Sequence, residues 1–336
     1  MKIMIAGLGS VGRRHLRNLR TLGIEDVLLY RTGRSTLPEE ELSHLPVETN
    51  LEAALAQRPE AVVVANPTSL HLDVAIPAAD AGCHLLIEKP LSDTLERIGE
   101  LSSALRRGGG RALVGFQYRF HPSLEKARRL LEDGAIGRPA YARAHYGDFL
   151  PAWHPWEDYR QAYSARAGLG GGVILTLCHP LDYLRWLLGE VEGVSAWEGT
   201  LGDLGIEVKD TAEIGLRFAS GALGSVHLNY LQRPAKHSLE IVGTLGTLRW
   251  DQAQGALLMH EAQGKDWQSL PLPAGFDRND MFLAEMRHFL RVIEGQAEPA
   301  CTLEDGVAAL RLCLTARQSA AQRAFVAVPP DELTRG

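Results

Sequence analysis

The chain has 336 residues, of which 45% are hydrophobic and 23% are charged, and its net charge is −6. This length predicts two domains, and the composition is typical of a globular protein. The negative charge, together with the lack of a basic block, excludes a nucleic-acid-binding or anionic-membrane surface.

The N-terminal residues predict a strand, a tight turn and the start of a helix. An apolar run precedes a loop with three glycines, and leucines then line one face of the helix. In such a loop the first glycine permits the turn, the second lets the backbone approach a pyrophosphate, and the third allows close helix–strand packing. The alternative is an ordinary strand–turn–helix. We predict that a dinucleotide binds at Gly7, Gly9, Ser10, Val11 and Gly12.

Up to about residue 120, strands and helices alternate. Strands are expected at residues 2–6, 26–30, 61–65, 84–88 and 112–116, and helices at 13–22, 51–57, 71–81 and 95–106. Continuous apolar strands suit a parallel sheet that is covered on both faces, and the alternation predicts a doubly wound α/β domain. We assign residues 1–121 to this dinucleotide-binding domain.

The loop after the second strand bears on cofactor choice. An NAD-specific site would place an acidic residue near this strand end to bind the ribose 2′-hydroxyl. The loop instead carries Arg31, Thr32 and Arg34, whose guanidinium and hydroxyl groups suit a 2′-phosphate. We therefore favour NADP(H), with NAD(H) as the alternative.

Polar segments also follow three later strands. Because a ligand binds outside the carboxyl ends of parallel strands, these segments are expected to converge on it. They are Asn66-Pro67-Thr68, Glu88-Lys89-Pro90 and Gln117-Tyr118-Arg119. At this edge an ammonium group could hydrogen-bond a substrate hydroxyl and stabilise developing alkoxide charge. We predict this role for Lys89 rather than that of a surface lysine.

From residue 122 the pattern changes. A helix is expected at 123–133, strands at 138–148, 191–200, 207–218, 222–232, 236–243 and 246–251, and helices at 280–294 and 303–323. The alternating strands and glycine-containing turns predict a large, mostly antiparallel open sheet. We assign residues 122–328 to a substrate-binding and oligomerisation domain and 329–336 to a tail.

A glycine-rich loop in this second domain leads into a helix that carries Thr176, His179 and Asp182. Residues three apart share one face of a helix. A histidine with a carboxylate one turn away is a usable acid/base pair, in which the carboxylate orients the imidazole. The alternative is a capping or core histidine. No second histidine or cysteine lies at metal-ligand spacing, so no metal is expected.

Residues 150–163 are dense in aromatic and hydrogen-bonding groups and have no regular period. Such a loop suits a polyhydroxylated ring, for which it offers stacking faces and fixed donors and acceptors. It is equally consistent with packing between domains. Its candidate substrate contacts are Tyr159, Arg160 and Tyr163.

Together these motifs resemble the glucose–fructose oxidoreductase and inositol dehydrogenase (Gfo/Idh/MocA) family over nearly the whole chain. The resemblance is carried by the glycine loop, Asn66-Pro67-Thr68 with His71, Glu88-Lys89-Pro90, residues 119–122, Gly137, and the glycine-rich helix start with His179 and Asp182. It implies a Rossmann domain, an α/β domain with an open sheet, and assembly as a homodimer or homotetramer.

The resemblance also implies roles for individual residues. Lys89 matches the family's active-site lysine and His179 its acid/base histidine. Asn66, Pro67, Thr68, His71, Glu88, Lys89 and Gln117 would contact the cofactor, and Lys89, Arg119, Thr176 and His179 the substrate. Many members carry an aspartate where this chain has Thr176. Either Asp182 compensates by orienting His179, the choice of substrate has changed, or proton transfer is weakened.

We therefore expect an NAD(P)-dependent oxidoreductase that transfers hydride between nicotinamide and a secondary hydroxyl, or its ketone, of a sugar, cyclitol or sugar derivative. One alternative is a glycosidase that retains its cofactor and acts by transient oxidation. Another is a non-catalytic dinucleotide-binding sensor.

The remaining features concern location. The four cysteines (Cys83, Cys178, Cys301 and Cys313) show no metal-type spacing, and in a chain of this length they do not suggest a disulfide scaffold, so we expect them to be reduced. The apolar N-terminus is interrupted by glycines and followed by arginines, unlike a signal peptide. We expect a cytoplasmic protein.

Overall fold

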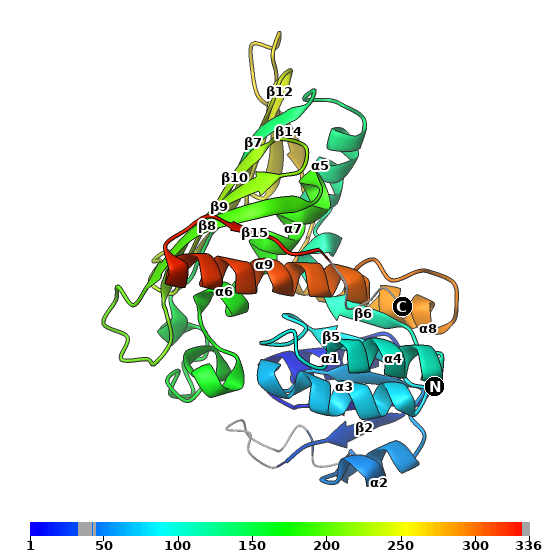
Figure 1. Cartoon of the computed structure of the whole chain (residues 1–336). Coiled ribbons are helices and arrows are strands. Elements are labelled where there is room, and N and C mark those ends of the chain that lie inside the picture. Colours follow the sequence, from blue (N-terminus) through cyan, green and yellow to red (C-terminus); the bar gives the residue numbers. More distant parts are fainter. Residues whose placement is uncertain (33–41, 43–44, 331–336) are drawn as a thin grey trace. The chain divides into compact units, whose positions relative to one another are not determined.

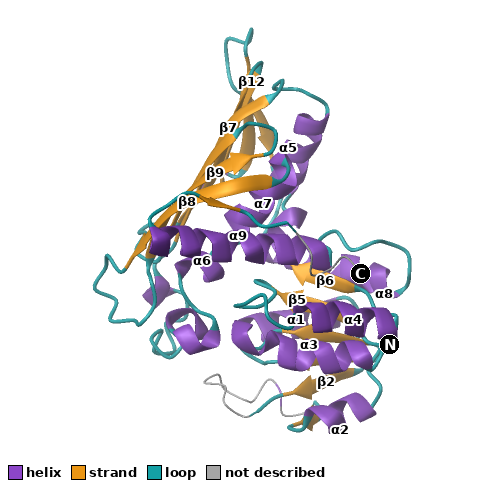
Figure 2. Cartoon of the chain, viewed as in Figure 1, coloured by secondary structure: helices purple, strands orange, loops and turns teal. Residues whose placement is uncertain are grey.

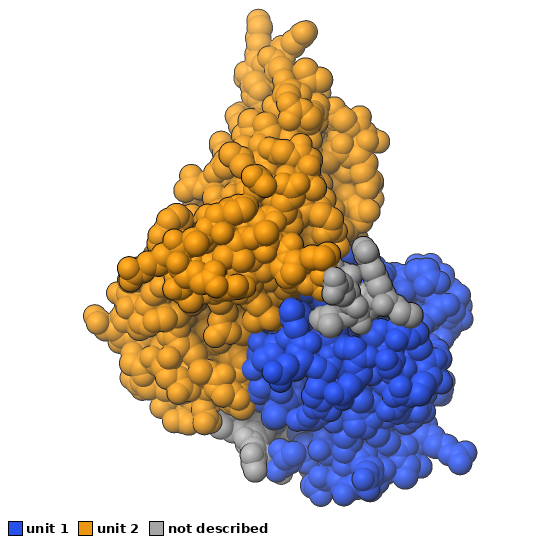
Figure 3. Space-filling model, in the orientation of Figure 1, with its two compact units in different colours: residues 1–117, 278–307, 331–336 blue, residues 118–277, 308–330 orange. Residues whose placement is uncertain are grey.

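The computed structural model describes residues 1–32, 42 and 45–330. The chain divides into two compact units (Figure 3). Unit 1 comprises Met1–Gln117 and Arg278–Val307, and unit 2 comprises Tyr118–Asp277 and Ala308–Pro330. The return of residues 278–307 to unit 1 is a feature that the sequence pattern does not predict.

Unit 1 is built on a six-stranded parallel sheet in the order β3-β2-β1-β4-β5-β6. Figure 1 labels β2, β5 and β6 of this sheet. The strands are β1 (Ile3–Ala6), β2 (Val27–Tyr30), β3 (Val47–Glu48), β4 (Ala61–Val64), β5 (His84–Glu88) and β6 (Ala112–Gly115). The order reverses between β1 and β4, which is where such sheets bind ligands.

The central strands of this sheet are apolar because both faces are covered. Every residue of β1 and β4 has an exposed fraction of 0%. Helix α1 (Ser10–Thr21) contacts α8 (Arg278–Ile293), and α3 (His71–Asp80) contacts α4 (Ile98–Gly108). Figure 2 shows helices flanking the sheet. The predicted doubly wound sheet is confirmed.

Two further helices complete unit 1. Helix α2 (Leu51–Ala56) is capped by Asn50, whose side chain accepts from the backbone N–H of Ala53. The first turn of α9 (Leu303–Gln322) also belongs here. A Cβ on Gly306 would lie 2.6 Å from a Val114 methyl carbon, so this glycine permits close packing of α9 on β6.

Unit 2 contains a nine-stranded sheet in the order β14-β13-β12-β11-β7-β10-β9-β8-β15. Among the described strands of this sheet, only β7 and β10 pair in parallel, which confirms the prediction of a mostly antiparallel sheet. The strands are β7 (Pro139–Gly147), β8 (Val191–Gly199), β9 (Thr211–Phe218), β10 (Leu223–Asn229), β11 (Lys236–Gly243), β12 (Gly246–Asp251), β13 (Ala256–Glu261), β14 (Gln268–Pro271) and β15 (Val326–Ala327).

One face of this sheet is covered by helices and the other is open. Helices α5 (Pro122–Glu132), α6 (Val173–Thr176) and α7 (His179–Leu188) contact β13, β9 and β10, and β7 respectively. Burial alternates along the strands as one covered face requires. The open face carries Tyr141, Trp197 and Leu223, with exposed fractions of 37%, 67% and 55%. Among the described residues, no helix is both long and apolar enough to cross a membrane.

Candidate functional site

The glycine loop after β1 has the geometry of a phosphate cradle. Gly7 has φ +93°, and a Cβ there would lie 2.5 Å from the backbone nitrogen of Asn66. A Cβ on Gly12 would collide with the carbonyl oxygen of Gly7. Among the described residues, a Cβ on Gly9 would meet nothing within 4 Å, so they leave this side of the loop open.

Helix α1 begins directly after Gly9 and supplies the positive end of a helix dipole. Its first turn carries no acidic side chain, and its N-cap makes no side-chain hydrogen bond. The backbone N–H groups of Ser10 and Val11 lie in this first turn, where intrahelical acceptors are missing. Loop and helix start therefore fit the pyrophosphate of a dinucleotide.

The segment after β4 is held by local hydrogen bonds. Asn66 donates from Nδ2 to the carbonyl oxygen of Leu70 at 2.8 Å. The Nε2 atom of His71 lies 2.9 Å from the carbonyl oxygen of Asn66, and its Nδ1 atom 3.3 Å from that of Leu91. Burial lowers the pKa of His71, although these backbone contacts and the charge of Glu88 oppose the shift. Thr68 is buried beside this turn.

Strand β5 ends at Glu88, so Lys89 lies at the carboxyl edge of the sheet. β5 is two strands from β1, a spacing of about 10 Å across the sheet. His15 of α1 lies 2.7 Å from Glu88, measured from Nε2 to Oε1. Burial raises the pKa of Glu88, but the His15 hydrogen bond and the charges of His15, Lys89 and His71 outweigh it and lower the pKa. Glu88 is therefore a carboxylate, and His15 Nε2 is the donor.

The remaining cofactor-side predictions follow β2 and β6. The backbone N–H of Arg31 donates to the carbonyl oxygen of Glu48 at 3.0 Å, and Arg31 is half-buried, whereas Thr32 is exposed. Arg34 lies outside the described residues. Gln117 begins a 3-10 turn after β6 and is 4% exposed.

Unit 2 places His179 at the first residue of α7. The imidazole is 3% exposed, and its ring meets the Tyr118 ring edge-on, with centroids 4.8 Å apart. Thr176 is instead the last residue of α6, so the expected single helix face holds only for His179 and Asp182. The break has a physical reason: within one continuous helix Pro180 would clash with the carbonyl of Thr176 and could not bond to it.

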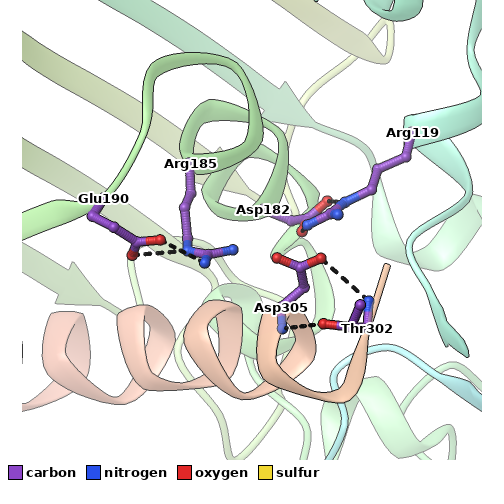
Figure 4. A network of polar contacts seen from close by, with 6 residues as sticks. All are labelled: Arg119, Asp182, Arg185, Glu190, Thr302 and Asp305. Carbon is purple, nitrogen blue, oxygen red and sulfur yellow. Dashed lines mark hydrogen bonds and ion pairs between the residues drawn. The ribbon is translucent and has the colours of Figure 1, made fainter. Parts of the chain in front are cut away.

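Asp182 forms a buried ion pair with Arg119. The guanidinium donates from Nη2 to Oδ1 at 2.6 Å and from Nε to Oδ2 at 3.0 Å (Figure 4). The two side chains are 2% and 1% exposed. Residues that the sequence suggested for substrate contact and for orienting His179 are thus paired with each other. The pair ties the segment before α5 to the first turn of α7.

The aromatic loop of unit 2 is ordered by its own contacts. Tyr159 donates to the carbonyl oxygen of Leu204 at 2.8 Å. Arg160 lies 3.3 Å from the Asp158 carboxylate and 4.8 Å above the Tyr159 ring, and it is exposed. Tyr163 is half-buried. The Tyr159 ring is therefore held at its hydroxyl by Leu204, and the Arg160 guanidinium lies over its face.

A hollow of about 450 Å³ lies elsewhere in unit 2, over β7, β11 and β12. Charged and polar side chains line most of it, including Arg143, Lys236 and Glu240. None of the predicted site residues in the described part of the chain lines this hollow.

Sequence reasoning missed two residues of these sites. His15 contacts Glu88, and Glu285 of α8 is buried near Glu88. A signal was available for Glu285, because it lies among Met281, Phe282, Met286 and Phe289 on the apolar face of its helix.

Comparisons with known proteins agree with this arrangement. Residues 1–116 match the oxidoreductase family with an NAD-binding Rossmann fold, and residues 124–249 match the Gfo/Idh/MocA C-terminal domain. Myo-inositol 2-dehydrogenase of Thermotoga maritima is 30% identical over 97% of this chain and 98% of its own.

Solved structures extend the likeness to the fold of the whole chain. Levoglucosan dehydrogenase in complex with NADH and levoglucosan has a TM-score of 0.87 at 22% identity, and the match covers 98% of this chain and 100% of that one. The WlbA dehydrogenase from Bordetella pertussis, in complex with NADH and UDP-GlcNAcA, has a TM-score of 0.82 at 26% identity, with coverage of 98% and 99%.

The parallel sheet, the glycine loop and the match to both domains lead to one assignment. The chain belongs to the Gfo/Idh/MocA family of NAD-binding oxidoreductases.

Proposed function

We propose that this protein oxidises a secondary hydroxyl of a sugar, cyclitol or sugar derivative, or reduces the corresponding ketone, with a nicotinamide dinucleotide. The observation that carries the proposal lies within unit 1. Lys89 follows a strand of the same parallel sheet edge as the glycine loop, and its neighbour Glu88 is anchored by His15. A cation and a phosphate cradle at one sheet edge suit hydride transfer between a cofactor and an alcohol.

A bound nicotinamide would accept or donate the hydride, and the protein's side chains would handle the proton. During oxidation the C–H electron pair leaves as hydride, and the hydroxyl proton passes to Nε2 or Nδ1 of His179. The Lys89 ammonium hydrogen-bonds the substrate oxygen and stabilises negative charge that develops there. Reduction uses the same groups in reverse.

Other residues would orient these groups. Asp182, held by Arg119, fixes the turn that carries His179. Thr176 offers a hydroxyl in place of the family aspartate. Tyr159, Arg160 and Tyr163 would hold further hydroxyls or an anionic substituent of the substrate.

Within this proposal the cofactor is NADP(H), with NAD(H) as the alternative. Arg31 and Arg34 supply guanidinium groups after β2, and Thr32 a hydroxyl. Guanidinium groups match a 2′-phosphate better than a 2′-hydroxyl. The affinities of the protein for NADPH and for NADH, both measured by nicotinamide fluorescence, test this preference. Tighter binding of NADH than of NADPH contradicts the arginine assignment.

The open face of the unit 2 sheet supports assembly with further copies of this chain. Cross-strand pairing places Trp197, Tyr141 and Leu223 on this one face. Large exposed apolar groups on one surface are typical of interfaces. Light scattering at micromolar concentration is expected to give a dimer or tetramer, and a monomer would contradict this part of the proposal.

The activity is tested by adding a panel of sugars and cyclitols to the purified protein with NADP+ or NAD+ and following absorbance of the reduced nicotinamide. Oxidation of at least one polyol, lost in Lys89→Ala and His179→Ala, is the expected result. Sugar release with no net absorbance change would instead indicate a glycosidase that retains its cofactor. Binding without turnover of any panel member would indicate a sensor.

A further inference from the structure

A cluster of three buried titratable side chains lies inside unit 1, and the proposed reaction does not use it directly. The cluster joins His15 of α1, Glu88 at the end of β5 and Glu285 of α8. Their potential ligand atoms all lie within 4.8 Å of one another. The exposed fractions are 0%, 8% and 0%. Lys89 follows Glu88 in the chain, so this cluster supports the backbone that carries the proposed catalytic cation.

The distance within the cluster indicates a proton rather than a metal ion. His15 Nε2 and Glu88 Oε1 are 2.7 Å apart. Two ligands of a tetrahedral zinc ion, each about 2.1 Å from the metal, would be about 3.4 Å apart. A separation of 2.7 Å is that of a charge-assisted hydrogen bond. His15 Nε2 and Glu88 Oε1 are therefore already paired with each other.

Glu285 is the group left over. Among the described residues neither of its carboxyl oxygens has a hydrogen-bond partner. A buried carboxylate without a partner is costly, and a second carboxylate beside it adds repulsion. Burial, and after it the negative charge of Glu88, raises the pKa of Glu285 well above its ordinary value.

Among the described residues, the charged groups near the cluster act on Glu88 or lie over an aromatic ring. Lys89 and His71 act on Glu88, and burial lowers the pKa of His71. Arg14 of α1 lies 4.4 Å from the centre of the Phe282 ring of α8. The charge on Glu285 is therefore removed most simply by a proton.

We propose that Glu285 is a positioning residue that stays in unit 1 as the neutral carboxylic acid, so that Glu88 remains the single anion held by His15 and Lys89 keeps its place at the sheet edge. The inference rests on the proposed function for the role of Lys89. Ionisation of Glu285 would set two carboxylates against each other and displace Glu88, and with it the start of the loop that carries Lys89.

The first test measures the protonation of Glu285 through stability. A group whose pKa is raised by folding contributes stability below its unfolded pKa and loses it as pH rises towards its folded pKa. Glu285→Gln has nearly the same shape and cannot ionise. Above about pH 4.5, the unfolding equilibrium constant of the wild type should rise by up to about tenfold per pH unit relative to Glu285→Gln.

A matched control is Glu294→Gln, which removes an exposed carboxylate just after the end of α8. Its denaturant-unfolding curves should run parallel to those of the wild type between pH 5 and 8. The same parallel behaviour in Glu285→Gln would overturn the proposal, because Glu285 would then be charged in the folded protein. Since His15, Glu88 and His71 are present in every variant, the difference between the curves isolates Glu285.

The second test asks whether the neutral form positions Glu88 and Lys89. Affinity for NADPH, followed by fluorescence, should fall about tenfold in the wild type as Glu285 ionises, which corresponds to a one-unit pKa difference between free and bound protein. Glu285→Gln should keep its affinity over that range. A fall of the same size in both proteins would remove the positioning role even if Glu285 proves neutral.

Neither readout needs a sugar substrate. If no panel member is oxidised, the proposed function fails while both measurements still decide the state and effect of Glu285. If turnover is found, kcat should show the same alkaline loss in the wild type and its absence in Glu285→Gln.

Discussion

In unit 1 the buried carboxylate of Glu88 is matched by His15 and has a second carboxyl group, Glu285, beside it, whereas in unit 2 the buried carboxylate of Asp182 is matched by Arg119. A guanidinium stays charged at any pH at which proteins fold. The two charges of the unit 2 pair therefore compensate each other at any such pH. The unit 1 cluster keeps a single negative charge only while Glu285 is protonated.

The units also respond to pH in opposite directions. Glu285 makes unit 1 less stable as pH rises. In unit 2, burial lowers the pKa of His121 to about 4, which makes this unit less stable as pH falls. Where a fold buries an ionisable group, the preferred charge state of that group determines the pH range in which the surrounding structure is stable.

The largest effects are expected on catalysis, where each unit supplies one group. Lys89→Ala in unit 1 and His179→Ala in unit 2 should each lower kcat by about 10²–10⁴-fold, because each removes a group that acts on the reacting oxygen or its proton. Steady-state kinetics with a substrate from the panel measures this. Binding of NADPH should persist in His179→Ala. Full kcat in either variant would contradict the assigned role.

The next prediction tests the buried Arg119–Asp182 ion pair of unit 2. Asp182→Ala should lower the free energy of unfolding by about 3–5 kcal/mol, because it leaves a buried guanidinium without its anion. Glu190→Ala is the matched control. It breaks the Arg185–Glu190 pair, in which Glu190 is 67% exposed and Nη2 lies 2.6 Å from Oε1 (Figure 4). This loss should be at most about 1 kcal/mol. Equal losses on urea unfolding would show that burial does not distinguish the two pairs.

A third prediction concerns acid. His121 accepts from the backbone N–H of Ser123 at 3.1 Å as the N-cap of α5, which requires a neutral Nδ1. Because folding lowers its pKa, the unfolded chain binds the proton first, and stability falls as pH drops from about 6.5 to about 4. The loss should be roughly 3 kcal/mol relative to His121→Asn, which keeps a capping acceptor without this titration. If the acid-unfolding curves of the wild type and His121→Asn ran parallel, the predicted loss of stability from protonation of His121 would be refuted.

The smallest expected effect is that of Gly9→Ala in unit 1, which should change cofactor affinity with little change in stability. Gly9→Ala should change stability by at most about 1 kcal/mol, since its Cβ meets nothing within 4 Å. It should weaken cofactor binding by about tenfold or more, because the pyrophosphate approaches the backbone there. Gly7→Ala should instead lower the melting temperature as well, because its φ is +93° and its Cβ would meet the Asn66 backbone. Unchanged NADPH affinity in Gly9→Ala would place the phosphates elsewhere.

Local chain chemistry made much of unit 1 predictable. The buried strands, the glycine loop and the position of Lys89 follow from short stretches of sequence, because hydrophobic periodicity and glycine geometry act over a few residues. The structure of unit 2 was harder to predict from the sequence. The strands β13 to β15 were not predicted. β14 and β15 are short edge strands, whose patterns are weak, whereas β13 is an interior strand of six residues that the sequence analysis missed.

The sequence by itself determined the doubly wound sheet, the open antiparallel sheet and the family. Tertiary structure alone decided the partners of the buried charges: Arg119 is 63 residues from Asp182 and His15 is 73 from Glu88. It also brought α8 back to α1, so that Glu285 joined a cluster with residues from the first third of the chain. Pairing over such separations depends on how whole helices and strands pack against each other, and a local sequence pattern does not predict that packing.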